Sequence, residues 1–84
     1  MNFDVEWIRE ATLELGKIWM NSPDREMVGR AAVELERSMI EDAAGLGESR
    51  EPGMRIAFQG PLIVTFWVNE QVKRALVLHV RERR

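Results

Sequence analysis

The spacing of the apolar residues changes twice along the chain, and these changes constrain the fold more than any other feature. Residues 3–7 alternate apolar and acidic side chains, which is the two-residue period of a half-buried β-strand. Residues 8–20, and a second stretch that runs to about Ala43, carry apolar residues at helical spacing. After residue 53 the period returns to two. The order of one strand, two helices and three strands predicts an α+β fold.

Polar and glycine-rich segments mark where these elements end. Asn21-Ser22-Pro23-Asp24 separates the two helices, with Ser22 suited to the N-cap and Pro23 to the first position of the second helix. So short a connection predicts an antiparallel helical hairpin. Residues 44–53 contain three Gly and one Pro and predict a loop.

Three strands are predicted in the C-terminal part, over residues 54–58, 62–68 and 74–80. Their short separations predict an antiparallel meander that buries one face against the helical hairpin, with the first strand at an edge of the same sheet. On the last strand, alternation places Leu76, Leu78 and Val80 on one face and Ala75, Val77 and His79 on the other.

The three tryptophans fall in different parts of this pattern. Trp7 and Trp19 fit the predicted core stripe. Trp67 lies on the strand face opposite Phe66, where it belongs either to a second small core or to an exposed contact with a partner.

The composition narrows the classes of protein and of chemistry. A chain of 84 residues predicts one domain over residues 1–84. It has no Cys for a disulfide or a thiolate and only one His, which argues against a conventional zinc site. No apolar run approaches the roughly 18 residues of a membrane span, and the N-terminus lacks a signal-peptide pattern. These features predict a soluble cytoplasmic protein with no metal and no cofactor.

A net charge of −2 conceals an uneven distribution of charge. Residues 1–48 carry five basic and eleven acidic side chains, a net charge of −6. Residues 49–84 carry seven basic and three acidic side chains, a net charge of +4. A basic surface on one half of a domain attracts polyanions even where the total charge is negative. The alternative is that the charges of both halves are ordinary solvated surface.

The basic half contains side chains suited to binding phosphate. They are Arg50, Arg55, Lys73, Arg74, Arg81, Arg83 and Arg84. If strand pairing brings Arg55 beside the last strand, several guanidinium groups share one sheet surface, where they could stabilise the charge of a phosphoryl transfer. Cleavage of RNA needs little more, because the 2′-hydroxyl supplies the nucleophile. The alternative is that these arginines keep a strand edge soluble.

His79 is the single imidazole of the chain and lies on a predicted strand. One interpretation is a packed or half-exposed structural residue. The other is a general base that takes the proton of a 2′-hydroxyl.

Several segments together carry a resemblance to a known family. They are Val5-Glu6-Trp7, Leu15-Gly16-Lys17-Ile18-Trp19, Asn21-Ser22-Pro23-Asp24-Arg25, Gly47-Glu48-Ser49-Arg50, Gly60-Pro61-Leu62-Ile63-Val64-Thr65-Phe66-Trp67-Val68 and Ala75-Leu76-Val77-Leu78-His79-Val80-Arg81. In this order they resemble the RelE/ParE superfamily of bacterial type II toxins. The resemblance spans nearly the whole chain and rests mainly on core patterns.

The resemblance implies a toxin that a small antitoxin protein holds inactive. The family contains ribosome-dependent mRNA endonucleases and inhibitors of DNA gyrase. For an endonuclease, the implied catalytic residues are Arg50, Arg55, His79 and Arg81, and the implied nucleic-acid-binding residues are Lys73, Arg74, Arg83 and Arg84.

The chain departs from the family pattern at three points. Related nucleases carry an Arg early in the middle strand, where this chain has Leu62-Ile63-Val64. They often carry a Tyr after the C-terminal basic run, whereas this chain contains no Tyr. His79 lies a few residues earlier than the C-terminal His of some relatives.

Three hypotheses about function follow. The first is a RelE/ParE-like toxin that cleaves ribosome-bound mRNA. The second is a binding protein without catalysis, either a gyrase-type inhibitor or an inactive relative that still binds an antitoxin. The third is a small structural protein unrelated to toxins. An antitoxin could lay a helix against the helical stripe or add a strand to the sheet edge, and its acidic segments would mask the basic half.

Overall fold

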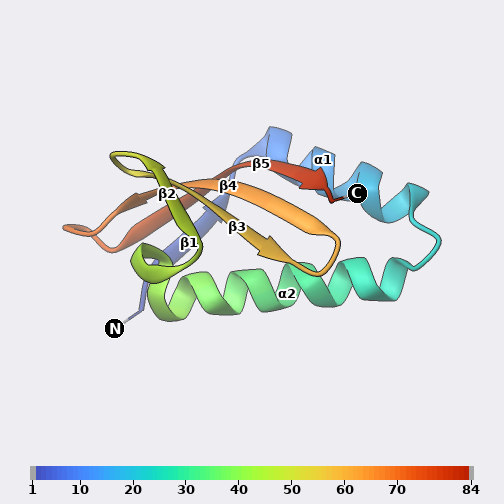
Figure 1. Ribbon diagram of the computed structural model, residues 1–84, viewed down its shortest axis with the longest axis horizontal. Helices are drawn as coiled ribbons and strands as arrows, with labels where there is room; N and C mark the ends of the chain where they lie inside the picture. The colour runs from blue at the N-terminus through green and yellow to red at the C-terminus, as the bar shows by residue number, and fades with distance from the viewer. Residues whose placement is uncertain (1, 84) are drawn as a thin grey trace.

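The computed structural model describes residues 2–83 and contains two long helices and one five-stranded sheet (Figure 1). In chain order the elements are β1 (Asp4–Trp7), α1 (Arg9–Asn21), α2 (Arg25–Asp42), the short 3₁₀ helix η1 (Ala43–Gly45), β2 (Glu48–Glu51), β3 (Met54–Gln59), β4 (Leu62–Asn69) and β5 (Arg74–Glu82). The predicted α+β fold, with a helical hairpin between the first strand and the meander, is confirmed. No helix among residues 2–83 is long and apolar enough to cross a membrane.

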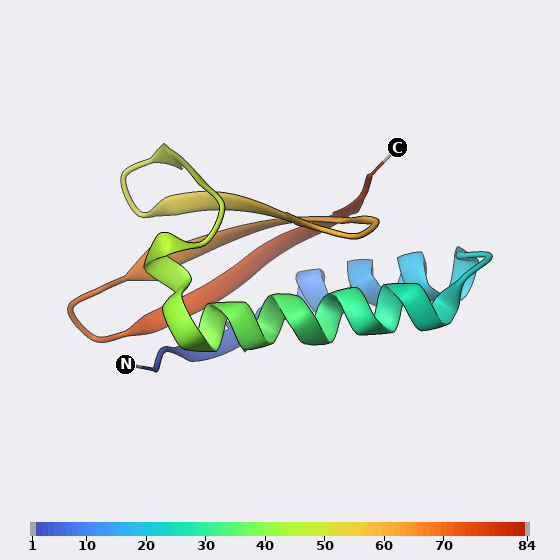
Figure 2. The same cartoon turned by 60° about the horizontal axis from the view of Figure 1, so that its bottom comes forward.

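The strands lie in the order β1-β5-β4-β3-β2. Neighbouring strands from β2 to β5 pair antiparallel, and β1 pairs parallel with residues Arg74–Val77 of β5, so the N-terminal strand lies at an edge as predicted. Both helices lie on the same side of the sheet (Figure 2). We call the covered side the helical face and the other side the open face.

The core lies between α2 and the central strands. One side of α2 and every second residue of β4 are buried: Val28, Ala31, Leu35 and Met39 from the helix, and Leu62, Val64, Phe66 and Val68 from the strand. Each large apolar side chain removed from water stabilises the fold by about 1.5–3 kcal/mol. This core packs the helices on one side of the sheet and leaves the open face free of them.

The turn between α1 and α2 differs from the prediction in two respects. The N-cap of α2 is Asp24, whose Oδ1 accepts a hydrogen bond from the backbone N–H of Met27 at 3.1 Å. The assignment of Ser22 to the N-cap was therefore wrong, and so was that of Pro23 to the first helical position, because Pro23 precedes the N-cap and the helix begins at Arg25. The Ser22 hydroxyl instead accepts from the N–H of Asp24 at 3.0 Å. Trp19 is not a core residue, because 43% of its surface is exposed and the Arg25 guanidinium lies 4.9 Å from its ring centre.

The predicted loop over residues 44–53 contains a strand that the sequence did not reveal. All four residues of β2 are exposed, so they have no apolar alternation to mark them. The strand exists because it pairs with β3 at Ser49↔Arg55 and Glu48↔Ile56. The meander therefore has four strands instead of three.

A β-bulge in β5 overturns the predicted faces of that strand. Thr65 pairs with His79 and the next residue, Phe66, pairs with Val77, so Leu78 is an extra residue in β5. The bulge reverses the alternation beyond it. Val80 therefore shares the buried helical face with Val77, whereas His79 is exposed beside Thr65.

Candidate nucleic-acid interface

Three exposed basic side chains lie in a row that runs from the C-terminal half of β5 to the residue just after this strand. His79 and Arg81 pair with Thr65 and Ile63, which lie on the open face of β4, and the backbone N–H of Arg83 donates to the Pro61 carbonyl at 2.6 Å. The Arg83 guanidinium lies 5.2 Å from the centre of the exposed Phe58 ring, which is close enough for a cation–π contact. We call His79, Arg81 and Arg83 the basic row. The bulge at Leu78 is what turns this row toward the open face.

Glu14 of α1 fixes the inner end of the basic row. Its Oε1 accepts a hydrogen bond from the backbone N–H of Val80 at 2.9 Å. This N–H lies beyond Val77, where the pairing of β1 with β5 ends, so the side chain takes the place of a neighbouring strand. The same Oε1 lies 3.8 Å from Nδ1 of His79, an ion-pair distance when the imidazole is protonated. The carboxylate thus lies on the Nδ1 side of the imidazole.

Arg55 does not join the basic row. Arg55 alternates with the buried Ala57 on β3 and pairs with the buried Phe66, which places its side chain on the helical face. Its Nε donates to the Leu46 carbonyl at 2.7 Å, and its Nη2 donates to the Gly47 carbonyl at 3.0 Å. The guanidinium therefore holds the segment that leads into β2. The sheet separates it from His79 and Arg81.

The other predicted basic residues are dispersed. Arg50 is exposed on β2, which β3 and β4 separate from β5 by roughly 14 Å at about 4.8 Å per strand. Lys73 lies in the turn before β5, with its Nζ 5.1 Å from the ring centre of Phe3. Arg74 begins β5 and forms an ion pair with Glu6 at 3.7 Å. Arg84 lies outside the described residues.

A second surface lies between the two long helices. An apolar groove of about 290 Å³ separates α1 from α2 and is lined by Thr12, Leu15, Gly16, Trp19, Val28, Gly29 and Ala32. A Cβ atom added at Gly16 or Gly29 would meet nothing within 4 Å, so the two glycines leave the groove open.

Residues 2–83 contain no group of three or more His, Cys, Asp or Glu side chains placed to hold a metal ion.

No model of a known protein family matches the chain, and no curated protein matches it in sequence. Solved structures do match it in fold. The toxin–antitoxin complex RelBE2 from Mycobacterium tuberculosis gives a TM-score of 0.77 at 20% identity, over 99% of this chain and 100% of that chain. The chromosomal ParDE system of P. aeruginosa gives 0.74 at 22% identity, over 98% and 97%. The archaeal RelE–RelB complex from Pyrococcus horikoshii OT3 gives 0.70 at 16% identity, over 99% and 97%.

This chain has the RelE/ParE fold. The match spans nearly the whole chain in all three comparisons, as the sequence resemblance predicted. Within this fold, sequence reasoning missed Glu14, because its contact with Val80 joins residues 66 positions apart. In the sequence, Glu14 is one of several carboxylates on an amphipathic helix. That pattern is too common to identify Glu14 as a functional residue.

Proposed function

We propose that this protein is a toxin of the RelE/ParE type that cleaves mRNA on the ribosome. The observation that carries the proposal is the basic row, in which His79, Arg81 and Arg83 lie together on the open face of the sheet. A single strand of RNA can approach this face because neither helix covers it. The positive charge there attracts the phosphate backbone, although the whole chain carries a net charge of −2.

The geometry of the basic row suits cleavage by the RNA's own 2′-hydroxyl. Nε2 of neutral His79 accepts the 2′-hydroxyl proton, and the 2′-oxygen attacks the adjacent phosphorus. The bond to the 5′-oxygen of the next nucleotide breaks, that oxygen takes a proton from water, and a cyclic phosphate remains. Arg81, about 7 Å further along the strand, stabilises the negative charge on the phosphoryl oxygens. Arg83 binds a neighbouring phosphate.

We further propose that a small antitoxin protein neutralises this toxin by placing a helix in the groove between α1 and α2. The solved structures of similar fold are toxin–antitoxin complexes. The groove is apolar and open at Gly16 and Gly29, and the exposed Trp19 lines its wall. An amphipathic helix binds such grooves through side chains spaced three and four residues apart. A short reading frame beside this gene that encodes such a helix would support the proposal.

A second function has an observation in its favour. Arg55 binds two backbone carbonyls of its own chain, and Leu62 and Val64 occupy the core where related nucleases carry an Arg. Both features fit a binding protein without catalysis, either a gyrase-type inhibitor or an inactive relative that binds an antitoxin. Such a protein would use the same open face to hold a partner and would cleave nothing.

Induced expression in a bacterial host separates these functions. Growth arrest accompanied by cleaved mRNA in cells that express the wild type or Arg37→Ala, but not in cells that express Arg81→Ala, supports the RNA-directed toxin. Arg37 is the matched control because it is an exposed arginine on α2 that pairs only with Glu34 at 3.3 Å. Growth arrest accompanied by loss of gyrase supercoiling, with intact mRNA, supports the inhibitor. Normal growth with all three folded proteins would contradict both toxin proposals.

A further inference from the structure

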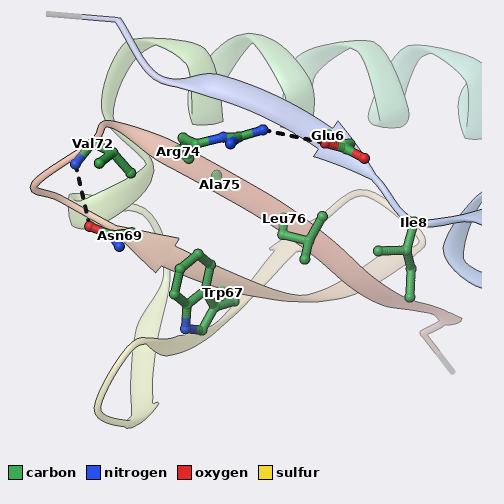
Figure 3. A pocket seen from close by; sticks show the side chains of 8 residues that line it. All are labelled: Glu6, Ile8, Trp67, Asn69, Val72, Arg74, Ala75 and Leu76. Carbon is green, nitrogen blue, oxygen red and sulfur yellow. Dashed lines mark hydrogen bonds and ion pairs between the residues drawn. The ribbon is translucent and has the colours of Figure 1, made fainter.

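The open face has a second feature at the opposite end of β5 from the basic row. A hollow of about 480 Å³ lies over β1, β5 and β4, within the range of about 300–1,000 Å³ of small-molecule sites (Figure 3). Its walls are mostly apolar and include Trp67, Leu76, Ile8 and Val72. Trp67 and Leu76 are cross-strand partners, and 37% of the Trp67 surface is exposed. A flat aromatic ring therefore faces solvent on the face that carries the basic row.

The indole of Trp67 is supported from one side by the turn between β2 and β3. The N–H of Val68 donates to the Gly53 carbonyl at 2.8 Å, which ties this turn to β4 beside the indole. A Cβ atom at Gly53 would lie 3.1 Å from Nε1 of Trp67, so the glycine backbone packs closely against the ring edge. Gly53 also has φ +83°, which a glycine adopts without strain. The turn thus packs against one edge of the indole and leaves part of the ring exposed.

Charge divides the open face into two regions. At the hollow, the Arg74 guanidinium is paired with the Glu6 carboxylate at 3.7 Å, and the exposed Asp4 lies opposite Arg74 in the strand register. The guanidinium at the hollow is therefore already paired and attracts a phosphate only weakly. The basic row, in contrast, has the guanidinium groups of Arg81 and Arg83 beside the single carboxylate of Glu14. The hollow therefore suits a neutral, flat and polar-edged group, whereas the basic row suits phosphate.

Two polar groups at the rim of the hollow are available to such a ligand. Oδ1 of Asn69 accepts from the N–H of Gln71 at 3.0 Å and of Val72 at 3.3 Å, which orients the amide. No described residue accepts a hydrogen bond from its Nδ2, so this group can donate to a ligand carbonyl. The Glu6 carboxylate can accept from an exocyclic amine, as carboxylates do from the N4 amine of cytosine.

We propose that the hollow binds one base of the RNA strand whose phosphates lie on the basic row. Trp67 stacks on the base, Asn69 donates to its carbonyl, and Glu6 accepts from its amine. Leu76 and His79 are three residues apart on β5, about 10 Å, so a single strand can reach both regions within a few nucleotides. This inference rests on the proposed function, since it names a base-recognising site for the RNA. A base site with these groups binds cytosine more tightly than uracil, because uracil lacks the exocyclic amine that Glu6 would accept from.

Nuclear magnetic resonance of the indole N–H signals tests the proposal without any need for cleavage. The chain has three tryptophans, of which Trp7 donates from Nε1 to Glu36 at 2.8 Å and Trp19 lies on the helical hairpin. Titration with a hexamer of cytidine nucleotides should shift the Trp67 signal and leave those of Trp7 and Trp19 unchanged. A hexamer of uridine nucleotides should bind several-fold more weakly.

Matched variants separate base binding from phosphate binding. Trp67→Leu, which keeps an apolar side chain, should weaken binding of the cytidine hexamer about 5- to 100-fold with an unchanged salt dependence. Arg81→Ala should reduce the slope of log affinity against log salt by about one. Trp19→Leu is the control and should bind as the wild type does. A Trp67→Ala variant, checked for folding by its methyl signals, provides a second test of the ring.

Opposite results would overturn the inference. Equal affinity of the Trp67→Leu and Trp19→Leu variants for the cytidine hexamer would show that the Trp67 indole does not bind the base. Equal affinity of the wild type for the cytidine and uridine hexamers would show that Glu6 does not recognise the amine. No shift of the Trp67 signal with either hexamer, but a shift with an antitoxin, would make the hollow a protein-binding site. A Trp67-dependent affinity without RNA cleavage on the ribosome would leave the inference standing and contradict the proposed nuclease alone.

Discussion

Replacing Arg55 by Ala should destabilise the protein, because this arginine joins two parts of its own chain. Its Nε and Nη2 donate to the carbonyls of Leu46 and Gly47 at 2.7 and 3.0 Å. A hydrogen bond from a charged donor contributes about 1.5–3 kcal/mol when it is shielded from water. The bond to Leu46 is partly buried and the bond to Gly47 is exposed, so the second contributes less. We expect a loss of about 2–3 kcal/mol in the free energy of unfolding.

Urea denaturation followed by circular dichroism measures this loss. In a domain of this size, 2–3 kcal/mol corresponds to a fall in the melting temperature of roughly 10–20 °C. Arg50→Ala is the control, because Arg50 is exposed on β2 and should change stability by less than about 0.5 kcal/mol. Arg55→Lys should restore only part of the stability, since lysine lacks the planar fork. If Arg55→Ala unfolds like Arg50→Ala but no longer cleaves RNA, Arg55 acts on the substrate and the structural account is wrong.

Three further substitutions test the packing by the same urea assay. Gly29→Ala should stabilise the protein by up to about 1 kcal/mol, because it lies within α2 and an added Cβ meets nothing within 4 Å; a loss of stability would refute the open groove. Gly47→Ala should destabilise it strongly, because φ is +69° and the Cβ would collide with the carbonyl oxygen of Ile56; wild-type stability would contradict this backbone. Phe66→Ala should cost about 3–5 kcal/mol, since Phe66 is fully buried under α2, and a cost below about 1 kcal/mol would place it outside the core.

The order and type of the long elements could be predicted because each has a distinct apolar period. The change from a period near 3.6 to a period of two separates α2 from the meander, and tertiary packing agrees with it at Leu35 and Phe66. β2 could not be predicted, because its four exposed residues owe their extended form to pairing with β3 and not to their own pattern.

The candidate site was predictable in part only. The basic residues of β5 are visible in the sequence, but their face depends on the bulge at Leu78, and strict alternation placed His79 with Val77. Arg55 carries the same charge as Arg81, yet it lies on the other face and binds carbonyls of its own chain. Residue type reveals which chemistry is available, whereas register decides which groups meet.

Primer extension on ribosome-bound mRNA tests the central claim most directly. Purified wild-type protein and the control Arg37→Ala should both cut the message within the ribosome and give the same cleavage products. Arg81→Ala should cut about 100- to 1,000-fold more slowly, because it lacks the cation that stabilises the phosphoryl oxygens. The absence of cleavage by folded wild-type protein, or equal rates for wild type and Arg81→Ala, would contradict an RNA-cleaving site on the open face.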